Sequence, residues 1–269
     1  MNQRTYWKRN AQLLVVILCA LALKQYYSTT NPNGLGWILA PTTTLVELVS
    51  GKTFEFESYS GYLSSDRTFL IAGSCAGVNF LITAFLLLSL RKLWGSRGQN
   101  ISWRFIPVAA LLAYLVTVIA NGVRISIALH LQRMSREFSW LTPNQLHRFE
   151  GIFIYFGFLL LLFMLSESRS SDRVSYATAS EESVRQSYAN QFRQYLFPLL
   201  IYYTTTLAVP LANSAYRHRL DFGLGTDFWQ HSLFVLMTPL LLLLPLAAFR
   251  FYRAPAPLPR QLRRNCPTL

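Results

Sequence analysis

Apolar residues along this chain gather in six long blocks, and this pattern restricts the fold more than any other feature. Each block has roughly 17 to 25 residues, enough for a helix to cross a hydrocarbon core of about 30 Å. Only 14% of the 269 residues are charged, against about 25% in soluble domains. The sequence therefore predicts an all-α fold, a polytopic transmembrane helical bundle. The expected spans are 11–27, 69–90, 105–128, 150–166, 195–213 and 231–252.

A seventh apolar stretch, 35–51, is shorter and contains both Pro41 and Glu47. We interpret it as an interfacial or re-entrant piece rather than a further span. The first block follows a basic start, as a signal peptide does, but no small-x-small cleavage site follows it. We therefore expect it to be retained as a signal-anchor helix.

The formal net charge of +13 is unevenly distributed along the chain. With a cytoplasmic N-terminus and six alternating spans, the inner segments hold sixteen basic and four acidic residues, and the outer segments hold nine and eight. Because basic loops resist translocation, this asymmetry predicts an N-in/C-in topology. The charge is thus a topology signal, and we expect a lipid bilayer and no nucleic acid as its partner.

The chain is expected to form a single integral membrane domain over 1–269, with no internal repeat. A serine-rich segment of mixed charge is typical of a flexible connector. The predicted parts are a core motif region 69–166, a cytoplasmic connector at about 167–194, a two-span C-terminal part 195–252 and a basic cytoplasmic tail 253–269.

The third block, "LVTVIANGVRISIALH", contains an arginine, Arg124, between two apolar residues. An unpaired arginine at the bilayer centre costs about 2.5–3.5 kcal/mol on insertion scales, so an ionisable residue there indicates a functional site. Asn121, one turn earlier on the same helix face, is placed to orient the guanidinium. The alternative is an arginine that snorkels from a helix end.

Cys75 stands in "GSCAGVNF" at the start of the second block, and Gly77 is one of the small neighbours that leave its sulfur unshielded. A helix that begins near Cys75 would favour the thiolate through its positive end. Asn79, four residues on, would then lie on the same face. The alternative is a buried cysteine that acts as a small hydrophobe. Three cysteines cannot form a disulfide framework, and Cys19 and Cys266 lie far from this position in the topology.

His147 precedes the fourth block in "HRFEGIFIYF", where Gly151 would let another helix pack closely. A thiolate is a strong nucleophile toward a carbonyl, a histidine can protonate the leaving amine, and an arginine stabilises an oxyanion. Together they describe acyl transfer through a thioester, with no metal or cofactor. Composition does not choose His147 over the other histidines on the same predicted side, which are His130, His218 and His231.

These three motifs, "GSCAGVNF", "NGVRISIALH" and "HRFEGIFIYF", resemble the catalytic motifs of the exosortase/archaeosortase family of integral membrane transpeptidases. The resemblance covers roughly residues 69–165, and the short chain favours the K-type branch. It implies Cys75, Arg124 and His147 as the catalytic set, and so selects His147 among the histidines. Many exosortases have a serine where this chain has Ala76, which cannot donate a hydroxyl hydrogen bond.

The resemblance implies an enzyme of the inner membrane with its active site on the extracytoplasmic side. It would cleave the C-terminal sorting signals of exported proteins, each with a short motif, a transmembrane helix and a basic end, and transfer the product to a cell-surface acceptor. Three alternatives stay open: a hydrolytic membrane cysteine protease, a transporter with an anion site at Arg124, and a scaffold without chemistry.

Overall fold

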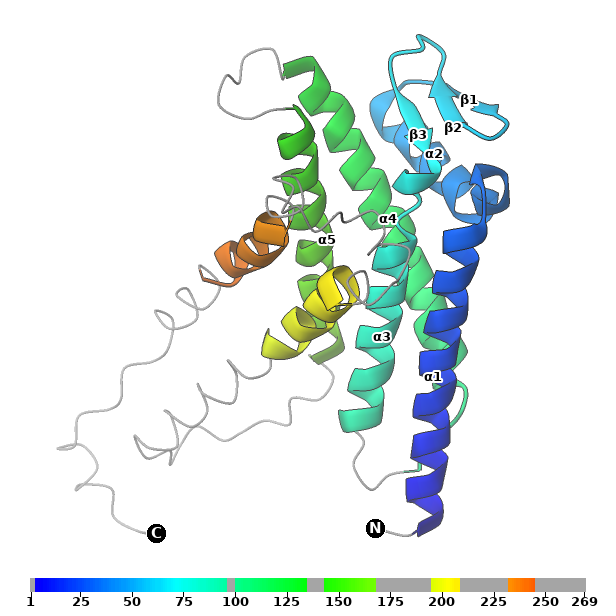
Figure 1. Cartoon of the computed structure of the whole chain (residues 1–269), viewed down its shortest axis with the longest axis vertical. Coiled ribbons are helices and arrows are strands. Elements are labelled where there is room, and N and C mark those ends of the chain that lie inside the picture. The colour runs from blue at the N-terminus through cyan, green and yellow to red at the C-terminus, as the bar shows by residue number, and fades with distance from the viewer. Residues whose placement is uncertain (1–2, 96–99, 135–142, 168–194, 209–231, 245–269) are drawn as a thin grey trace, which may run out of the picture.

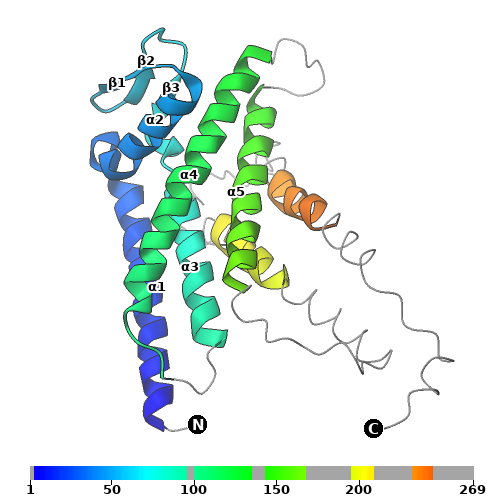
Figure 2. The same ribbon diagram turned by 180° about the vertical axis from the view of Figure 1, so that it is seen from behind.

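Four long helices lie side by side along the long axis of the molecule (Figures 1 and 2). They are α1 (Gln3–Thr29), α3 (Val78–Gly95), α4 (Phe105–Met134) and α5 (Pro143–Glu167). Two shorter helical segments, 195–208 and 232–244, are tilted against these four. The computed structural model describes residues 3–95, 100–134, 143–167, 195–208 and 232–244.

Four helical segments in the described ranges are long and apolar enough to cross a membrane, and they coincide with the first four predicted blocks. Of the fifth and sixth blocks only 195–208 and 232–244 are described, and each is shorter than a span. The connector from residue 168 to 194 and the tail 253–269 lie outside the described residues. The candidate spans are Thr5–Thr29, Gly73–Gly95, Phe105–Leu131 and Arg148–Ser166.

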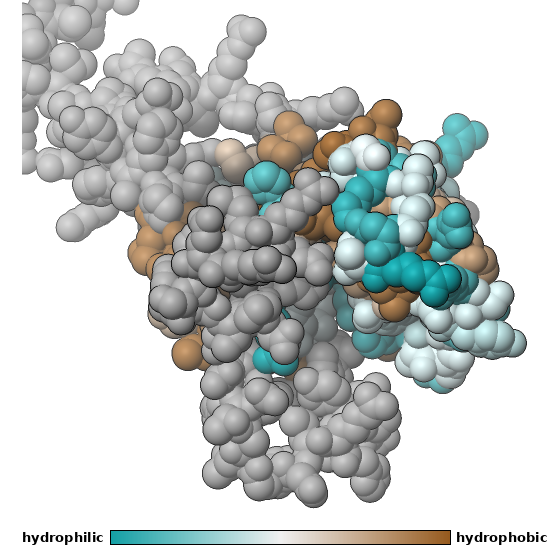
Figure 3. All heavy atoms as spheres, turned by 90° about the horizontal axis from the view of Figure 1, so that it is seen from above, coloured by the Kyte–Doolittle hydropathy of each residue, from teal (hydrophilic) through white to brown (hydrophobic). Residues whose placement is uncertain are grey.

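The outward faces of the long helices carry exposed aliphatic side chains. On α4, Leu111, Leu115 and Ile119 recur every four residues and are all exposed, so they form one apolar stripe along the helix. Such a stripe is unfavourable in water but suits the hydrocarbon of a bilayer. Hydrophilic side chains gather instead over the end of the bundle that carries the sheet (Figure 3).

The expectation of an all-α fold is wrong for one segment, because residues 54–72 form a three-stranded antiparallel sheet. Its strands are β1 (Phe54–Glu57), β2 (Gly61–Ser64) and β3 (Leu70–Ala72), in the order β1-β2-β3. Left-handed backbone at Tyr59 and Arg67 turns the chain between strands. The alternation of apolar and polar residues in "FEFESYSGYL" is the signal for this hairpin.

The seventh apolar stretch forms the helix α2 (Gly36–Ser50), which packs along α4. Pro41 has no N–H, so the Trp37 carbonyl four residues earlier lacks its helical partner. The Tyr114 hydroxyl of α4 donates to that carbonyl at 2.9 Å, and the rings of Trp37 and Tyr114 stack with centroids 5.9 Å apart. Helix α4 thus completes the hydrogen bonding of α2.

A hydrogen bond from the sheet to Glu47 links the sheet to α2. Oε1 of Glu47 accepts the N–H of Phe54, the first residue of β1, at 2.8 Å. The helix then ends at Gly51 in the left-handed conformation, with φ of 68°. With fifteen residues, α2 is about 22 Å long, too short to cross the bilayer.

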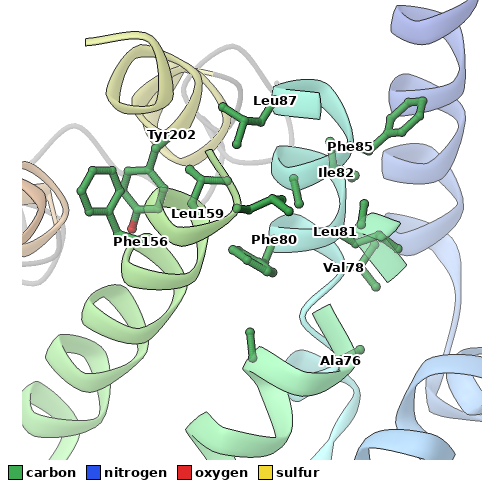
Figure 4. Close-up of a cluster of buried hydrophobic side chains, with 14 of the residues drawn as sticks. Ala76, Val78, Phe80, Leu81, Ile82, Phe85, Leu87, Phe156, Leu159 and Tyr202 are labelled. Atoms are coloured by element: carbon green, nitrogen blue, oxygen red, sulfur yellow. The ribbon is translucent and has the colours of Figure 1, made fainter. Parts of the chain in front are cut away.

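The buried core draws on all four long helices and on α2, and its largest group of apolar side chains comes from α3 (Figure 4). Tyr202, from the segment 195–208, packs edge-on against Phe156 of α5 with ring centroids 5.3 Å apart. The hydroxyl of Thr205 in the same segment lies 2.8 Å from that of Thr83 on α3. These contacts attach 195–208 to the four-helix core.

Removing the Tyr114 hydroxyl by Tyr114→Phe should lower the stability of the protein by about 1 kcal/mol, because the Trp37 carbonyl loses its donor. The thermal unfolding midpoint in detergent measures this. Tyr59→Phe is the control, since Tyr59 is 73% exposed. An unchanged midpoint in Tyr114→Phe would show that the bond contributes nothing.

The Asp66 carboxylate accepts hydrogen bonds from Lys52, Ser64 and Thr68, with Lys52 Nζ at 2.6 Å. These bonds, of which the one from Lys52 contributes most, hold the pKa of Asp66 well below its usual value. Since the folded-state pKa is depressed, the stabilisation is complete above about pH 4 and is lost as the pH falls further. The difference in unfolding midpoint between wild type and Asp66→Asn should shrink below that pH. A difference that is constant from pH 7 to pH 3 would contradict this.

Candidate functional site

Cys75 lies in a short 3-10 turn, Gly73–Cys75, between the end of β3 and the start of α3 at Val78. It therefore precedes the helix rather than opening it, which corrects the expectation from the sequence. Left-handed Gly77, with φ of 69°, reorients the chain, so Asn79 does not continue a helical face from Cys75. Its Oδ1 instead accepts from Nζ of Lys24 on α1 at 2.7 Å.

At Gly77 the backbone of this turn lies close to side chains of α4 and α5. A Cβ built on it would lie 3.2 Å from the Tyr155 hydroxyl and 3.3 Å from both Asn121 Cγ and Thr117 Cγ2. The positive φ also disfavours any residue with a side chain. Only glycine therefore lets the Cys75 turn press against α4 and α5.

Asn121 of α4 is fully buried and holds the turn in place. Its Nδ2 donates to the backbone carbonyl of Cys75, and its Oδ1 accepts from the Tyr155 hydroxyl at 2.8 Å. The sequence predicts that Asn121 orients the guanidinium of Arg124. The structure instead connects Asn121 to Arg124 through Tyr155.

Arg124 stands one turn after Asn121 on α4 and points toward α5. Its Nη1 donates to the Tyr155 hydroxyl at 3.3 Å, and its guanidinium carbon is 5.3 Å from the centre of the Tyr155 ring. It also interacts electrostatically with Cys75 and with the buried Glu150. These contacts direct the guanidinium into the protein and oppose the snorkelling interpretation.

Gly151 of α5 makes room for this guanidinium. A Cβ there would lie 2.9 Å from Nε of Arg124, closer than real contacts allow. The sequence suggests that Gly151 admits a neighbouring helix, whereas the structure shows that it admits one side chain of that helix.

Tyr155 is the site residue that sequence reasoning misses. It lies one turn after Gly151 on α5, and its ring stacks on Phe80 of α3 at 4.9 Å with an interplanar angle of 14°. Its hydroxyl joins Arg124 to Asn121, and Asn121 in turn reaches Cys75. The available signal was a tyrosine inside an apolar span, where a hydroxyl needs a partner.

His147 belongs to the second turn of α5, but its side chain lies outside the described part of the structure. Arg148, the next residue, lines the cavity described below. Of the other histidines, His130 is exposed near the end of α4, and His218 and His231 lie outside the described residues. The structure therefore brings Cys75 and Arg124 together and places only the backbone of His147.

A cavity of about 270 Å³ opens beside the turn that contains Cys75, although Cys75 itself is not among the residues that line it. Ser74 and Gly77, on either side of the cysteine, contribute to its wall, as do Arg124, Arg148 and Tyr155. Asn79 also lines it, so this expected supporting residue does reach the site. The cavity combines two cations, Arg124 and Arg148, with aromatic walls.

No protein-family model, curated protein or solved structure matches this chain. The resemblance to exosortases consequently stays a prediction from three sequence motifs. The chemistry must be argued from the geometry of the site itself.

A cysteine thiolate is a strong nucleophile toward a carbonyl, and Arg124 interacts electrostatically with Cys75. The same cation can stabilise an oxyanion that forms within its reach. The adjoining cavity offers space for the group that carries the attacked carbonyl. The arrangement can therefore perform acyl transfer through a thioester.

Replacing Gly151 by alanine should destabilise the protein, whereas the same change at Gly157 on the same helix should not. A helical Gly→Ala change gains about 0.5–1 kcal/mol. Displacing a hydrogen-bonded guanidinium costs about 1.5–3 kcal/mol, and a Cβ on Gly157 meets nothing within 4 Å. Thermal unfolding in detergent separates the two variants. Equal midpoints would mean that Arg124 is not held against Gly151.

Proposed function

We propose that this chain is a membrane-embedded cysteine transpeptidase that cleaves C-terminal sorting signals of exported proteins and transfers them to a cell-surface acceptor. The observation that carries the proposal is that the Arg124 guanidinium lines a cavity beside the turn that contains Cys75, and that Asn121, one turn before Arg124, holds this turn against α4. The three motifs that resemble exosortases give the same residues. The proposed protein has six spans in an N-in/C-in orientation, with the site on the extracytoplasmic side of the inner membrane.

The proposed first step is attack of the Cys75 thiolate on the scissile carbonyl. A C–S bond forms, and the carbonyl electron pair moves onto oxygen, where the permanently charged Arg124 stabilises it. The intermediate then collapses, the C–N bond breaks, and His147 as imidazolium donates a proton to the leaving amine. The product is a thioester on Cys75.

The second step resolves the thioester. An acceptor amine attacks its carbonyl, His147 takes the proton of the amine, and the thiolate of Cys75 leaves. Helices around the cavity restrict water, which favours a second nucleophile over hydrolysis. When water is the acceptor instead, the same site acts as a hydrolytic protease.

The position of the polar residues supports an enzyme more than a transporter. Arg124 and Arg148 line the cavity. Lys24 near the end of α1, Arg124 in the second half of α4 and Arg148 near the start of α5 lie in the parts of these helices nearer the sheet (Figure 1). A transport path requires polar groups through the whole bilayer depth. For a transporter, Arg124→Ala would abolish function and Cys75→Ser would preserve it.

Trapping of the thioester tests the proposal. Membranes that contain this chain and a tagged exported protein with a C-terminal sorting helix are treated with hydroxylamine, which intercepts thioesters. Before hydroxylamine is added, the wild type should carry a covalent adduct at Cys75. Hydroxylamine should then release this adduct as a hydroxamate product, and Cys75→Ala should give neither adduct nor hydroxamate.

Cys19→Ala is the matched control, because Cys19 is an exposed cysteine on α1 away from the cavity, and it should process substrate as the wild type does. Arg124→Ala should lower processing by about a hundredfold or more. Product mass without hydroxylamine separates transfer from hydrolysis. Full processing by Cys75→Ala would rule out the mechanism.

A further inference from the structure

The Tyr155 hydroxyl occupies the centre of a chain of hydrogen bonds that connects three elements. It accepts from Arg124 Nη1 at 3.3 Å and donates to Asn121 Oδ1 at 2.8 Å. Asn121 in turn donates to the backbone carbonyl of Cys75. One hydroxyl on α5 thus contacts the guanidinium directly and the cysteine turn through a single side chain.

The direction of each bond is determined by the chemistry of the groups. A guanidinium only donates, so the tyrosine oxygen must accept from Arg124. Its single proton is then directed to the Asn121 oxygen, which leaves the amide N–H₂ of Asn121 for the Cys75 carbonyl. Reversal of the Asn121 amide would bring its oxygen against the Cys75 carbonyl, and the bond to the turn would be lost.

The Tyr155 ring is fixed on both sides, so its hydroxyl has a defined position. The ring stacks on Phe80 of α3, and the Arg124 guanidinium approaches its centre to 5.3 Å. Next to the hydroxyl, Gly77 has no side chain, and a Cβ there would come within 3.2 Å of it. A side chain at residue 77 would therefore crowd the Tyr155 hydroxyl.

We propose that Tyr155 is a positioning residue, which holds the Arg124 guanidinium and, through Asn121, the Cys75 turn in a fixed relation to each other. This inference rests on the proposed function, and Tyr155 acts through these groups rather than on the substrate. In acyl transfer, a thiolate and an oxyanion-stabilising cation must be placed together to within a fraction of an ångström, and a displacement of about 1 Å can cost a hundredfold in rate.

Tyr155→Phe retains the ring stacked on Phe80 and removes only the hydroxyl. In the substrate-processing assay, kcat should fall about tenfold to a hundredfold and KM should change by less than about twofold, since the ring that lines the cavity is retained. In an Arg124→Gln background, the same change should add less than about a twofold loss, because the two residues act as one unit.

A second readout needs no substrate. In a chain with serine at Cys19 and Cys266, iodoacetamide alkylates Cys75 at a rate that depends on its thiolate fraction. Tyr155→Phe and Arg124→Gln should each slow alkylation several-fold, and the double variant should react no more slowly than Arg124→Gln alone. Tyr114→Phe is the matched control, because it also removes a tyrosine hydroxyl bonded across helices but lies outside the site, and it should react as the wild type does.

The outcomes separate this inference from the proposed function. Slower alkylation in Tyr155→Phe without any substrate processing by the wild type would support the positioning role and reject the transpeptidase. Alkylation at the wild-type rate in Tyr155→Phe would overturn the positioning role, whatever the activity. The positioning role would also be overturned if the fold-losses of the two single variants multiplied in the double variant. Such additivity in free energy means that Tyr155 does not act through Arg124.

Discussion

The bond from the Asn121 amide to the carbonyl of Cys75 is the contact on which the rest of the site depends. It fixes a non-helical turn, located between a sheet and a helix, against the side of α4. A backbone carbonyl inside a bilayer needs a donor, and Asn121 supplies it from a span that has Arg124 on the same face. The cysteine and the arginine therefore come together because the backbone of the turn must be satisfied.

Helix α2 and the three-stranded sheet help to position Cys75. Helix α2 packs along α4, and Glu47 joins α2 to the first strand. The third strand then leads directly into the cysteine turn. The position of Cys75 is thus determined from one side by the sheet and from the other by Asn121 and the tight approach at Gly77.

Hydropathy alone predicts four of the long helices, and the polar residues inside apolar blocks identify Cys75, Arg124, Asn79 and Asn121. What the sequence could not provide are the contacts between distant segments. The role of Tyr155 depends on the depth at which α5 packs against α4, and Gly151 is explained only by the guanidinium of another helix. Hydropathy does not predict the β1–β2 hairpin for a different reason, because its strands have only four residues each and form no apolar block. The span count of six rests on charge and hydropathy beyond the described residues.

The central claim is that a guanidinium lies beside the thiol of Cys75, and charge-selective labelling tests it most directly. Cys75 should react with an anionic methanethiosulfonate several-fold faster than with a cationic one, relative to the ratio for a free thiol, because Arg124 attracts the anion. This preference should disappear in Arg124→Gln. Equal relative rates in the wild type, or a preference that survives Arg124→Gln, would contradict the account.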